Sequence, residues 1–287
     1  MTGDPRTAAP DSVMSQRVLL VGASGYLGRH IGVCLDARGH EVIIGDPRSE
    51  LADLGDPVDV VVNAAGAGMS SDVPGTTAVE MLSANVGVAI WCVRAGSILG
   101  ARVVHLGTLA ESRGSPEFDA YRDTKRLGTE AVRLARSVDG LDAVILRPSL
   151  IYGGGGRGVV EAMAREIAIG RPFKLRQPDR RRDLIHVSDV ASAVVKAVES
   201  PEVRCPEIEI GSGLSTKLSD VADSLAQRLE QPRGWVADDE GSQRADEDES
   251  VDTGPAKQFL SFEARVTLDE GLDLIAREAR AERISRT

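Results

Sequence analysis

Residues 17–28 read Arg-Val-Leu-Leu-Val-Gly-Ala-Ser-Gly-Tyr-Leu-Gly, and this stretch decides the fold. An apolar run stops at a glycine turn and a helix-like pattern follows, so a buried strand leads through the turn into a helix. The free N–H groups and the dipole of such a helix N-terminus favour a pyrophosphate. Gly22 permits the sharp turn, Gly25 lets phosphates reach the backbone, and Gly28 permits close packing of the helix on the strand. We therefore predict a dinucleotide-binding turn rather than an ordinary strand–helix connection, with cofactor contacts from Gly22, Ser24, Gly25, Tyr26, Leu27 and Gly28.

The composition is that of an ordinary soluble globular protein, with 287 residues of which 27% are charged and 42% apolar. This length suits one large domain, alone or with a smaller lobe. The net charge of −10 argues against nucleic acid and anionic membrane surfaces as partners. No apolar run approaches the length of a membrane span, so we also expect no membrane insertion.

The three cysteines, Cys34, Cys92 and Cys205, lie far apart and give neither a metal-binding spacing nor an even set for disulfides. We therefore expect a reducing, cytoplasmic environment and no metal site. Residues 1–15 contain Pro, Asp and Ser without an apolar core, so we interpret residues 1–16 as a flexible tail and not as a signal peptide.

A second strand is predicted over residues 41–45, and it ends at Asp46, about 20 residues beyond the glycines. A carboxylate there can accept hydrogen bonds from the adenosine ribose and repel a 2′-phosphate, which favours NAD. Arg48 has the opposite effect, because a guanidinium can hold a 2′-phosphate, so NADP remains open. The alternative for Asp46 is a turn residue before Pro47.

Two further strands are predicted, and both end in small or hydroxyl-bearing residues. Residues 58–62 lead into Asn63 and then Ala64, Ala65 and Gly66, whose small side chains would let the adenosine side of the cofactor lie across the strand end. Residues 102–108 end at Thr108, and His105 within them is interpreted as a packed strand residue rather than a catalyst. Residues 78–99 predict a long helix between these strands. It carries Asn85, whose role stays open because an Asn inside a helix more often faces solvent.

Alternating strand and helix patterns after this opening predict an α/β fold with a doubly wound parallel (Rossmann) sheet. Ligands of such sheets bind at the carboxyl ends of the strands. Asp46, Thr108 and the glycine turn all fall at such ends, so they are consistent with one site.

Tyr121 and Lys125 lie four residues apart on a predicted helix that continues to about Arg136, so they share one helix face. A phenol has a pKa of roughly 10, and a neighbouring ammonium lowers that pKa. We therefore expect Tyr121 to exchange a proton near neutral pH.

The order of glycine turn, Thr108 and Tyr121-x-x-x-Lys125 resembles the extended short-chain dehydrogenase/reductases, the NAD(P)-dependent epimerase/dehydratase family. Later segments extend the resemblance over about residues 17–275. The matching segments are residues 146–153 (LRPxxxYG in the family), 182–191 (R-D-F-V-H-V-x-D-V-A), 208–213, 252–257 and 267–272.

The resemblance implies a role for each catalytic residue. Lys125 would bond the nicotinamide ribose and tune Tyr121, Tyr121 would donate or accept a proton, and Thr108 would hydrogen-bond the reacting oxygen. Pro148, in the LRP strand, would contact the cofactor.

The usual substrates of the family are nucleotide-diphosphate sugars, whose diphosphate needs cationic residues. Arg182 matches a family arginine on the substrate side, and Arg244 fits a second one more loosely. Arg180 and Arg181 add nearby charge or form a solvated turn.

The sequence departs from the family pattern in three places. Leu109 and Ala110 stand where 4,6-dehydratases carry an Asp-Glu pair, so that elimination chemistry is not expected. Leu150 stands where epimerases and dehydratases usually have Asn, and it echoes the R-T-S-W-V-Y pattern of the dTDP-4-dehydrorhamnose reductase group. Only 12 residues separate Thr108 from Tyr121, so we expect a short active-site lid and unusual substrate selection.

Four consecutive glycines, Gly153–Gly156, are interpreted as a hinge into a smaller lobe. We therefore expect a dinucleotide-binding domain over 17–155, to which 184–205 returns. The substrate-binding lobe is expected over 156–183 and 206–287, with an acidic solvated loop near residues 235–254.

The leading hypothesis is an NAD(P)-dependent enzyme that reduces a keto group, at C4, of a nucleotide-linked deoxysugar, with Tyr121 as proton donor. A nucleotide-sugar epimerase is the alternative within the fold. A dinucleotide-binding sensor without turnover is a third reading, although such proteins often lack a Tyr-Lys pair. The resemblance also implies a homodimer formed through the helices at 78–99 and 121–136.

Overall fold

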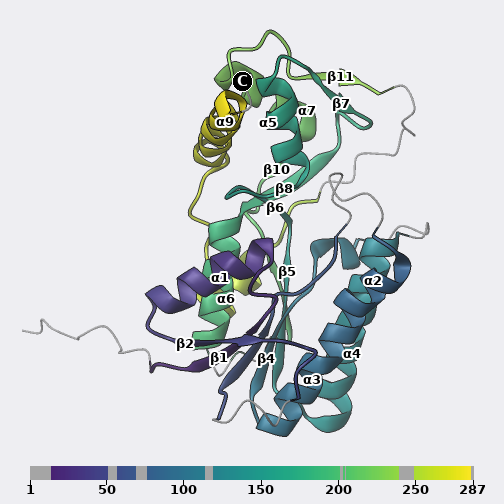
Figure 1. Cartoon of the computed structure of the whole chain (residues 1–287), viewed down its shortest axis with the longest axis vertical. Coiled ribbons are helices and arrows are strands. Elements are labelled where there is room, and N and C mark those ends of the chain that lie inside the picture. The colour runs from purple at the N-terminus through teal and green to yellow at the C-terminus, as the bar shows by residue number, and fades with distance from the viewer. Residues whose placement is uncertain are drawn as a thin grey trace, which may run out of the picture.

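The structure is a computed structural model that describes residues 14–50, 57–68, 76–113, 119–200, 203, 205–238 and 249–285. Most of the expected N-terminal tail lies outside these residues. Figure 1 shows a larger part built around a parallel sheet and a smaller lobe above it.

The larger part contains a six-stranded sheet in the order β2-β1-β3-β4-β5-β9. Every neighbouring pair is parallel, which confirms the predicted doubly wound sheet. The central strands are almost wholly buried, because their sequences are continuous apolar runs. The strands are β1 (Arg17–Val21), β2 (Glu41–Gly45), β3 (Val60–Asn63), β4 (Arg102–Leu106), β5 (Ala143–Pro148) and β9 (Glu207–Ile210).

Helices cover both faces of this sheet (Figure 1). One face carries α1 (Tyr26–Ala37) and α6 (Val187–Glu199), which pack on each other and on a shared apolar core. The other face carries α3 (Val88–Leu99) and α4 (Ala120–Asp139).

The predicted helix at 78–99 is present but is not regular throughout. It comprises α2 (Ala78–Leu82), a π-helical turn η2 (Ser83–Gly87) and α3. By length and composition alone this 22-residue stretch could cross a membrane, with a mean hydropathy of 1.4, so the expectation that no apolar run reaches that length is wrong. Here the stretch packs against α4 and the sheet.

Three helices of the larger part end at a glycine in the left-handed region. Gly39 follows α1, Gly100 follows α3 and Gly140 follows α4, with φ of +82°, +64° and +69°. Each precedes the next strand, so all three lie at the amino edge of the sheet. A Cβ at any of them would meet nothing within 4 Å.

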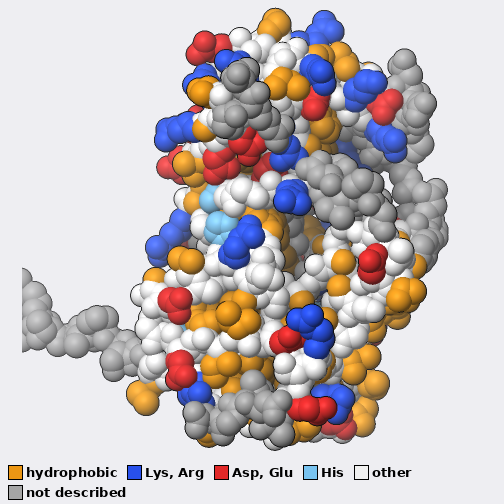
Figure 2. All heavy atoms as spheres, in the orientation of Figure 1, with side chains coloured by type: hydrophobic (Ala, Val, Ile, Leu, Met, Phe, Trp, Pro, Cys, Tyr) orange, Lys and Arg blue, Asp and Glu red, His pale blue; other side chains and the backbone are white. Residues whose placement is uncertain are grey.

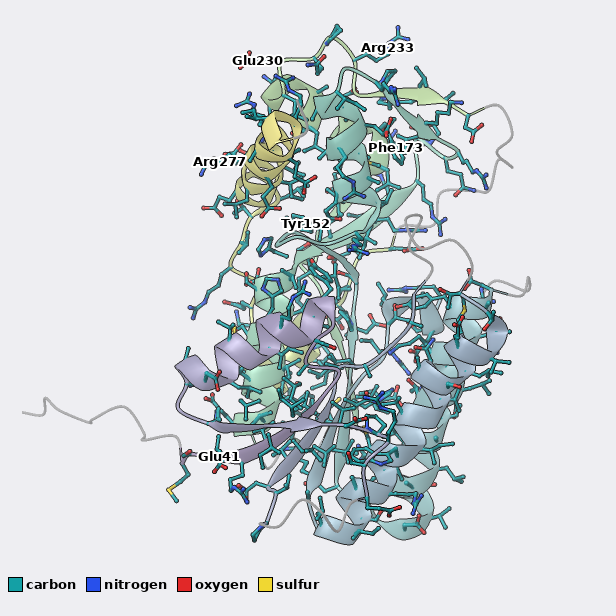
Figure 3. The ribbon with its side chains drawn as sticks, in the orientation of Figure 1. Glu41, Tyr152, Phe173, Glu230, Arg233 and Arg277 are labelled. Atoms are coloured by element: carbon teal, nitrogen blue, oxygen red, sulfur yellow. The ribbon has the colours of Figure 1, made fainter. Side chains whose placement is uncertain are left out.

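The smaller lobe has its own apolar core, formed between three helices and a short parallel ladder. Figure 3 labels Phe173, Glu230, Arg233 and Arg277 in this lobe and Glu41 in the larger part. Its elements are α5 (Val159–Ala168), β7 (Phe173–Leu175), α7 (Leu218–Arg228), β11 (Trp235–Ala237) and α9 (Leu268–Ser285).

A three-stranded sheet, β10-β8-β6, lies between the two parts. The sequence predicted that residues 184–187 return to the large sheet, but β8 pairs with β6 and β10 instead. The return is made by α6 and by β9, which lies in the segment assigned to the smaller lobe. The strands are β6 (Leu150–Tyr152), β8 (Arg181–His186) and β10 (Ser215–Lys217), and α8 (Gly254–Leu260) packs under β9.

Asp183 on β8 connects this small sheet to three loops around it. Its buried carboxylate accepts hydrogen bonds from Ser149 Oγ at 3.1 Å, from the N–H groups of Ser212 and Gly213 at 2.8 Å, and from Val251 N at 3.1 Å. One carboxylate therefore holds the chain together where β5 leaves the large sheet.

The glycine hinge is tied to α1. Gly153, Gly154 and Gly155 have φ of +92°, +58° and +74°. The Tyr26 hydroxyl donates to Gly153 O, and His30 Nε2 lies 3.1 Å from Gly154 O. Figure 3 shows nearby Tyr152 where the two parts meet, and Figure 2 shows histidine side chains at this junction.

Candidate active site

The glycine turn has the geometry that its sequence predicts. Gly22 has a φ of +86°, and a Cβ there would lie 2.6 Å from Ala65 N, at the end of the neighbouring strand. A Cβ on Gly28 would lie 2.0 Å from Gly22 O, so the helix packs on the strand only because the position is glycine. Gly25 N donates to Gly22 O at 2.9 Å and closes the turn.

The N-terminus of α1 fits an anionic group. Gly25 is its N-cap, no side chain caps the free N–H groups, and the first turn carries no acidic residue. Ser24 and Gly25 are exposed, and Tyr26 and Leu27 are partly exposed. The residues present therefore suit a dinucleotide pyrophosphate, and their contacts with it remain a prediction.

Asp46 and Arg48 form an ion pair beyond the end of β2. Arg48 Nη2 lies 2.8 Å from Asp46 Oδ2, and Arg48 Nε lies 2.9 Å from Asp46 Oδ1. The side-chain hydrogen bond from Arg48 lowers the pKa of Asp46 to about 2. The two residues that were assigned opposite cofactor preferences therefore neutralise each other.

Asn85, whose role the sequence left open, is buried rather than exposed to solvent. Its Oδ1 accepts from Ala67 N at 2.9 Å, and its Nδ2 donates to Ala67 O at 3.0 Å and to Thr124 Oγ1 at 2.9 Å. Asn85 therefore fixes the segment after β3, which contains Ala64, Ala65 and Gly66, against α4.

The predicted catalytic residues are brought together at the carboxyl edge of the sheet. Thr108 follows β4, and its side chain hydrogen-bonds the hydroxyl of Tyr121 from the first turn of α4. Lys125 is 6% exposed, and its Nζ donates to Leu106 O at 2.6 Å. A Cβ on Gly66 would lie 3.6 Å from that Nζ, so the segment after β3 that is predicted to contact the cofactor lies next to the ammonium. Pro148 ends β5, two strands from β3 in the same sheet.

The pKa values of this group differ from the prediction. Burial raises the pKa of Tyr121, the hydrogen bond from Thr108 lowers it, and the charges of Glu111 and Asp119 raise it. Burial lowers the pKa of Lys125 to about 8. The expectation that Lys125 makes the Tyr121 phenol acidic is wrong in this structure, because burial raises the pKa of Tyr121 and the charge of Lys125 is not among the interactions that lower it. His105 is a packed strand residue, as predicted, and burial lowers its pKa to about 3.

The predicted substrate-side arginine is already paired. Arg182 Nη1 forms an ion pair with Glu249 Oε1, and both side chains are about 15% exposed, at 15% and 14%. Arg180 Nη2 lies 3.6 Å from the same carboxylate, whereas Arg181 Nη1 donates to Ser215 O at 2.9 Å. Arg244 lies outside the described residues.

Sequence reasoning missed Glu111, whose carboxylate lies behind Thr108 and accepts from Thr108 N at 2.9 Å. The signal was available, because a Thr followed three residues later by a Glu is the spacing of a capping box. No comparable signal existed for Asn85, since its partners come from distant segments.

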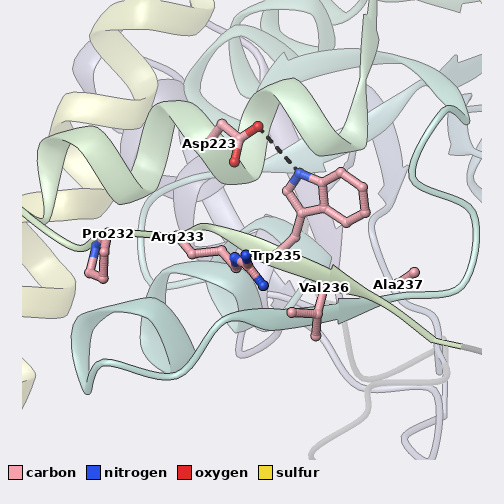
Figure 4. A pocket seen from close by; sticks show the side chains of 6 residues that line it. All are labelled: Asp223, Pro232, Arg233, Trp235, Val236 and Ala237. Atoms are coloured by element: carbon pink, nitrogen blue, oxygen red, sulfur yellow. Dashed lines mark hydrogen bonds between the residues drawn. The ribbon is translucent and has the colours of Figure 1, made fainter.

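A shallow pocket of about 580 Å³ lies elsewhere, on the smaller lobe (Figure 4). Trp235 Nε1 donates to Asp223 Oδ2 there at 3.2 Å. None of the predicted site residues lines this pocket, so it is not the catalytic site. Among the described residues no group of three or more His, Cys, Asp or Glu side chains could hold a metal ion.

A doubly wound parallel sheet, a glycine turn and a Thr-Tyr-Lys group at the carboxyl edge together define a short-chain dehydrogenase/reductase. A comparison with known families matches residues 18–211 to the NAD dependent epimerase/dehydratase family. The chain belongs to this family and is an NAD(P)-dependent enzyme.

Individual relatives agree with this assignment. The chain is 27% identical over 305 residues to a dTDP-6-deoxy-L-talose 4-dehydrogenase (NAD(P)(+)) of Kitasatospora kifunensis, covering 89% of this chain and 93% of the relative. Its fold is similar to that of MoeE5 in complex with UDP-glucose and NAD, at 23% identity and a TM-score of 0.77 over 94% of this chain and 100% of that one. It is also similar to RMD from Pseudomonas aeruginosa complexed with NADPH, at 19% identity and a TM-score of 0.77 over 93% and 100%.

Proposed function

We propose that the protein reduces a keto group, at C4, of a nucleotide-diphosphate deoxysugar, with Tyr121 as the proton donor. The observation that carries this proposal is the hydrogen bond between the Tyr121 hydroxyl and Thr108, beside the buried ammonium of Lys125. The 4-dehydrogenase relative supports the C4 position and a dTDP-linked 6-deoxysugar.

Each residue has a definite task in this proposal. NAD(P)H, when bound, supplies the hydride. Thr108 and Tyr121 hydrogen-bond the carbonyl oxygen, and Tyr121 transfers its proton as negative charge develops there. Lys125 holds the nicotinamide ribose from its place beside Gly66, while the turn at Gly22–Gly28 holds the pyrophosphate.

The environment of Tyr121 suits the role of a proton donor at neutral pH. Because burial raises its pKa, the phenol keeps its proton and is ready to donate it. Oxidation of an alcohol needs the phenolate as a base, and that form becomes available only at more alkaline pH.

The test is a cofactor-oxidation assay over a panel of nucleotide-linked 4-keto sugars. We expect Tyr121→Phe to bind NADH normally and to lose about 100-fold or more in kcat. Tyr152→Phe is the matched control, because Tyr152 lies at the junction between the lobes and touches no predicted catalytic residue; it should keep wild-type kcat. Wild-type rates in Tyr121→Phe would remove the proton-transfer assignment.

The same assay separates the alternative functions. An epimerase would convert a nucleotide sugar into its C4 epimer without net consumption of NAD(P)H. A sensor would bind the cofactor and turn over no sugar in the panel. Stoichiometric consumption of cofactor with one alcohol product supports the reductase.

We propose that both cofactors are used, with NADH preferred. Asp46 favours the free ribose diol, whereas its ion pair with Arg48 offsets the repulsion of a 2′-phosphate. The NAD(P)(+) in the name of the Kitasatospora relative supports dual use.

A fluorescence titration of each cofactor tests this proposal. Asp46→Ala should bring the affinities for NADH and NADPH closer together, and Arg48→Ala should weaken the binding of NADPH alone. Unchanged affinities for both cofactors in Asp46→Ala would remove that residue from the ribose contact.

We also propose a homodimer through α3 and α4. Large apolar side chains lie exposed along this face, and Figure 2 shows them on the lower right border, where Figure 1 places α2, α3 and α4. Two copies related by a two-fold axis would cover both surfaces at once. The exposed residues are Val79, Leu82, Ile90, Ile98, Leu127, Leu134 and Val138.

A further inference from the structure

Glu111 is a buried carboxylate that the mechanism above does not use. It ends the 3₁₀ turn η3 (Leu109–Glu111) that follows Thr108, and its side chain is 2% exposed. Its Oε1 accepts from Thr108 N at 2.9 Å, while Thr108 Oγ1 accepts from Ala110 N at 3.4 Å. This reciprocal capping directs the carboxylate into the protein, behind the residue that contacts the Tyr121 hydroxyl.

Charged and polar groups face this carboxylate from two other elements. From α4, the Thr129 hydroxyl hydrogen-bonds it, and its charge acts on Lys125 and Tyr121. From β5, Arg147 Nε lies 3.7 Å from Oε2.

The other neighbours leave Lys125 in need of a countercharge. Arg147 is already paired with Glu207 at 2.5 Å. On the β4 side, Lys125 faces His105, which is neutral at ordinary pH, and the uncharged carbonyl of Leu106. Glu111 is the carboxylate whose charge acts on the ammonium.

We propose that Glu111 is a positioning residue of the catalytic centre, whose carboxylate holds the backbone of Thr108 and supplies the countercharge that keeps the buried Lys125 ammonium protonated. The proposal deepens the proposed function and rests on it, since it concerns the same site. A buried charge without a partner would otherwise lose its proton or destabilise the fold.

The pKa shifts of Glu111 and Lys125 are coupled in the way that this geometry requires. Burial raises the pKa of Glu111, and the hydrogen bond from Thr129 and the charges of Lys125 and Arg147 act against that rise. Burial brings the pKa of Lys125 down to about 8, and the charge of Glu111 acts against that fall. Because this value lies near neutrality, a further decrease would leave much of Lys125 uncharged at the pH of a cell. A neutral amine attracts ribose oxygens less strongly, so turnover should fall as the pH rises through the pKa of Lys125.

The variant that tests the proposal is Glu111→Gln, which keeps the side-chain length and an acceptor for Thr108 N but removes the charge. The protonation of Lys125 can be followed directly by NMR of lysine labelled with ¹³C at Cε, because the chain has only five lysines. A Lys125→Met variant assigns the resonance. We expect the titration midpoint of Lys125 to fall by about one pH unit, which is a tenfold change in the protonation equilibrium.

Glu80→Gln is the matched control. Thr77 and Glu80 form the same capping box at the start of α2, where Thr77 N donates to Glu80 Oε2 at 2.7 Å. This variant should leave the Lys125 midpoint unchanged. Glu111→Asp, which restores the charge, should move the midpoint back toward the wild-type value.

A midpoint in Glu111→Gln equal to that of the wild type would overturn the proposal, even if the variant were less stable or less active. If Glu111→Gln does not fold, the coupling can be read from its partner, because the interaction of two titrating groups is reciprocal. In Lys125→Met, the pKa of Glu111 should rise in ¹³C-glutamate NMR, and an unchanged value would also overturn the proposal. Neither titration needs a substrate, so the result is independent of which sugar the enzyme reduces.

Discussion

Two arginines that could bind phosphate groups are held by carboxylates of the same chain. Arg48 is paired with Asp46 and Arg182 with Glu249. We propose that Arg182 binds the diphosphate of the substrate, and an internal carboxylate on this arginine then competes with that ligand. Under this proposal, the affinity for a nucleotide diphosphate depends on the release of Glu249 as well as on the strength of the new contacts.

This competition predicts that Glu249→Gln binds dTDP or UDP about threefold to tenfold more tightly, because about 0.7–1.4 kcal/mol of ion pairing no longer has to be broken. Isothermal titration calorimetry measures the change, and NADH affinity should stay constant. Glu230→Gln is the control, since it removes the carboxylate of a different ion pair, 3.2 Å from Arg280 in the smaller lobe. Weaker nucleotide binding in Glu249→Gln would instead show that Glu249 orients Arg182 for its ligand.

At the scale of single elements, the N-terminus of α4 controls the geometry of the site. Asp119 is the N-cap, and its side chain accepts from Arg122 N at 2.7 Å. Tyr121 stands in the same turn, so any fraying of this turn would displace the proposed proton donor. The negative charge of Asp119 also raises the pKa of Tyr121.

Two substitutions separate the capping of α4 by Asp119 from the effect of its charge on the pKa of Tyr121. Asp119→Ala removes the cap and should cost about 1 kcal/mol of stability in urea unfolding, together with a loss of kcat. Asp119→Asn keeps a capping side chain but removes the charge, so stability should hardly change while the pKa of Tyr121 falls. The reductive rate of Asp119→Asn should then decline at a lower pH than that of the wild type. Identical pH profiles would mean that the charge of Asp119 does not reach the phenol.

The elements that the sequence predicted well are those whose pattern is local. The strand before Gly22 and the helix at 121–136 follow from patterns within the segment itself. The approach of Thr108 to Tyr121 could also be predicted, because parallel strands end at the same edge.

What could not be predicted depends on contacts between distant segments. The partner of Asn85 is the backbone of Ala67, and the acceptor for Lys125 is the carbonyl of Leu106. The carboxylate of Asp183 on β8, which pairs with β6, connects three separate loops. No local spacing records such contacts or the burial of the Tyr121 hydroxyl, and this burial is why the pKa of Tyr121 was predicted in the wrong direction.

At the scale of the whole molecule, α3 and α4 carry several large apolar side chains that are exposed to solvent. Leu134 and Val138 on α4 are 63% and 70% exposed, and Ile98 on α3 is 64% exposed. Only 28% of the most apolar stretch within residues 78–99 is buried in the protein. A second copy of the chain would cover these side chains.

The proposed dimer predicts that Leu134→Glu is a monomer in size-exclusion chromatography with light scattering, whereas the wild type has twice the chain mass. A charge placed in the middle of an apolar interface cannot be hydrated there, which costs several kcal/mol of association free energy. Ile169→Glu is the control, because Ile169 is also exposed, at 51%, but lies at the end of α5 in the smaller lobe. A monomeric wild type would contradict the proposal, and its co-sedimentation with lipid vesicles would assign the face to a membrane instead.

The three left-handed glycines at Gly39, Gly100 and Gly140 lie on the border of the sheet opposite the chemistry, with open space around them. Foreign sequence should therefore be tolerated there: a peptide tag, a fluorophore or an anchoring cysteine grafted next to these positions would touch neither the nucleotide nor the sugar. An enzyme tethered to a bead through this border would keep its working side turned to the surrounding solution.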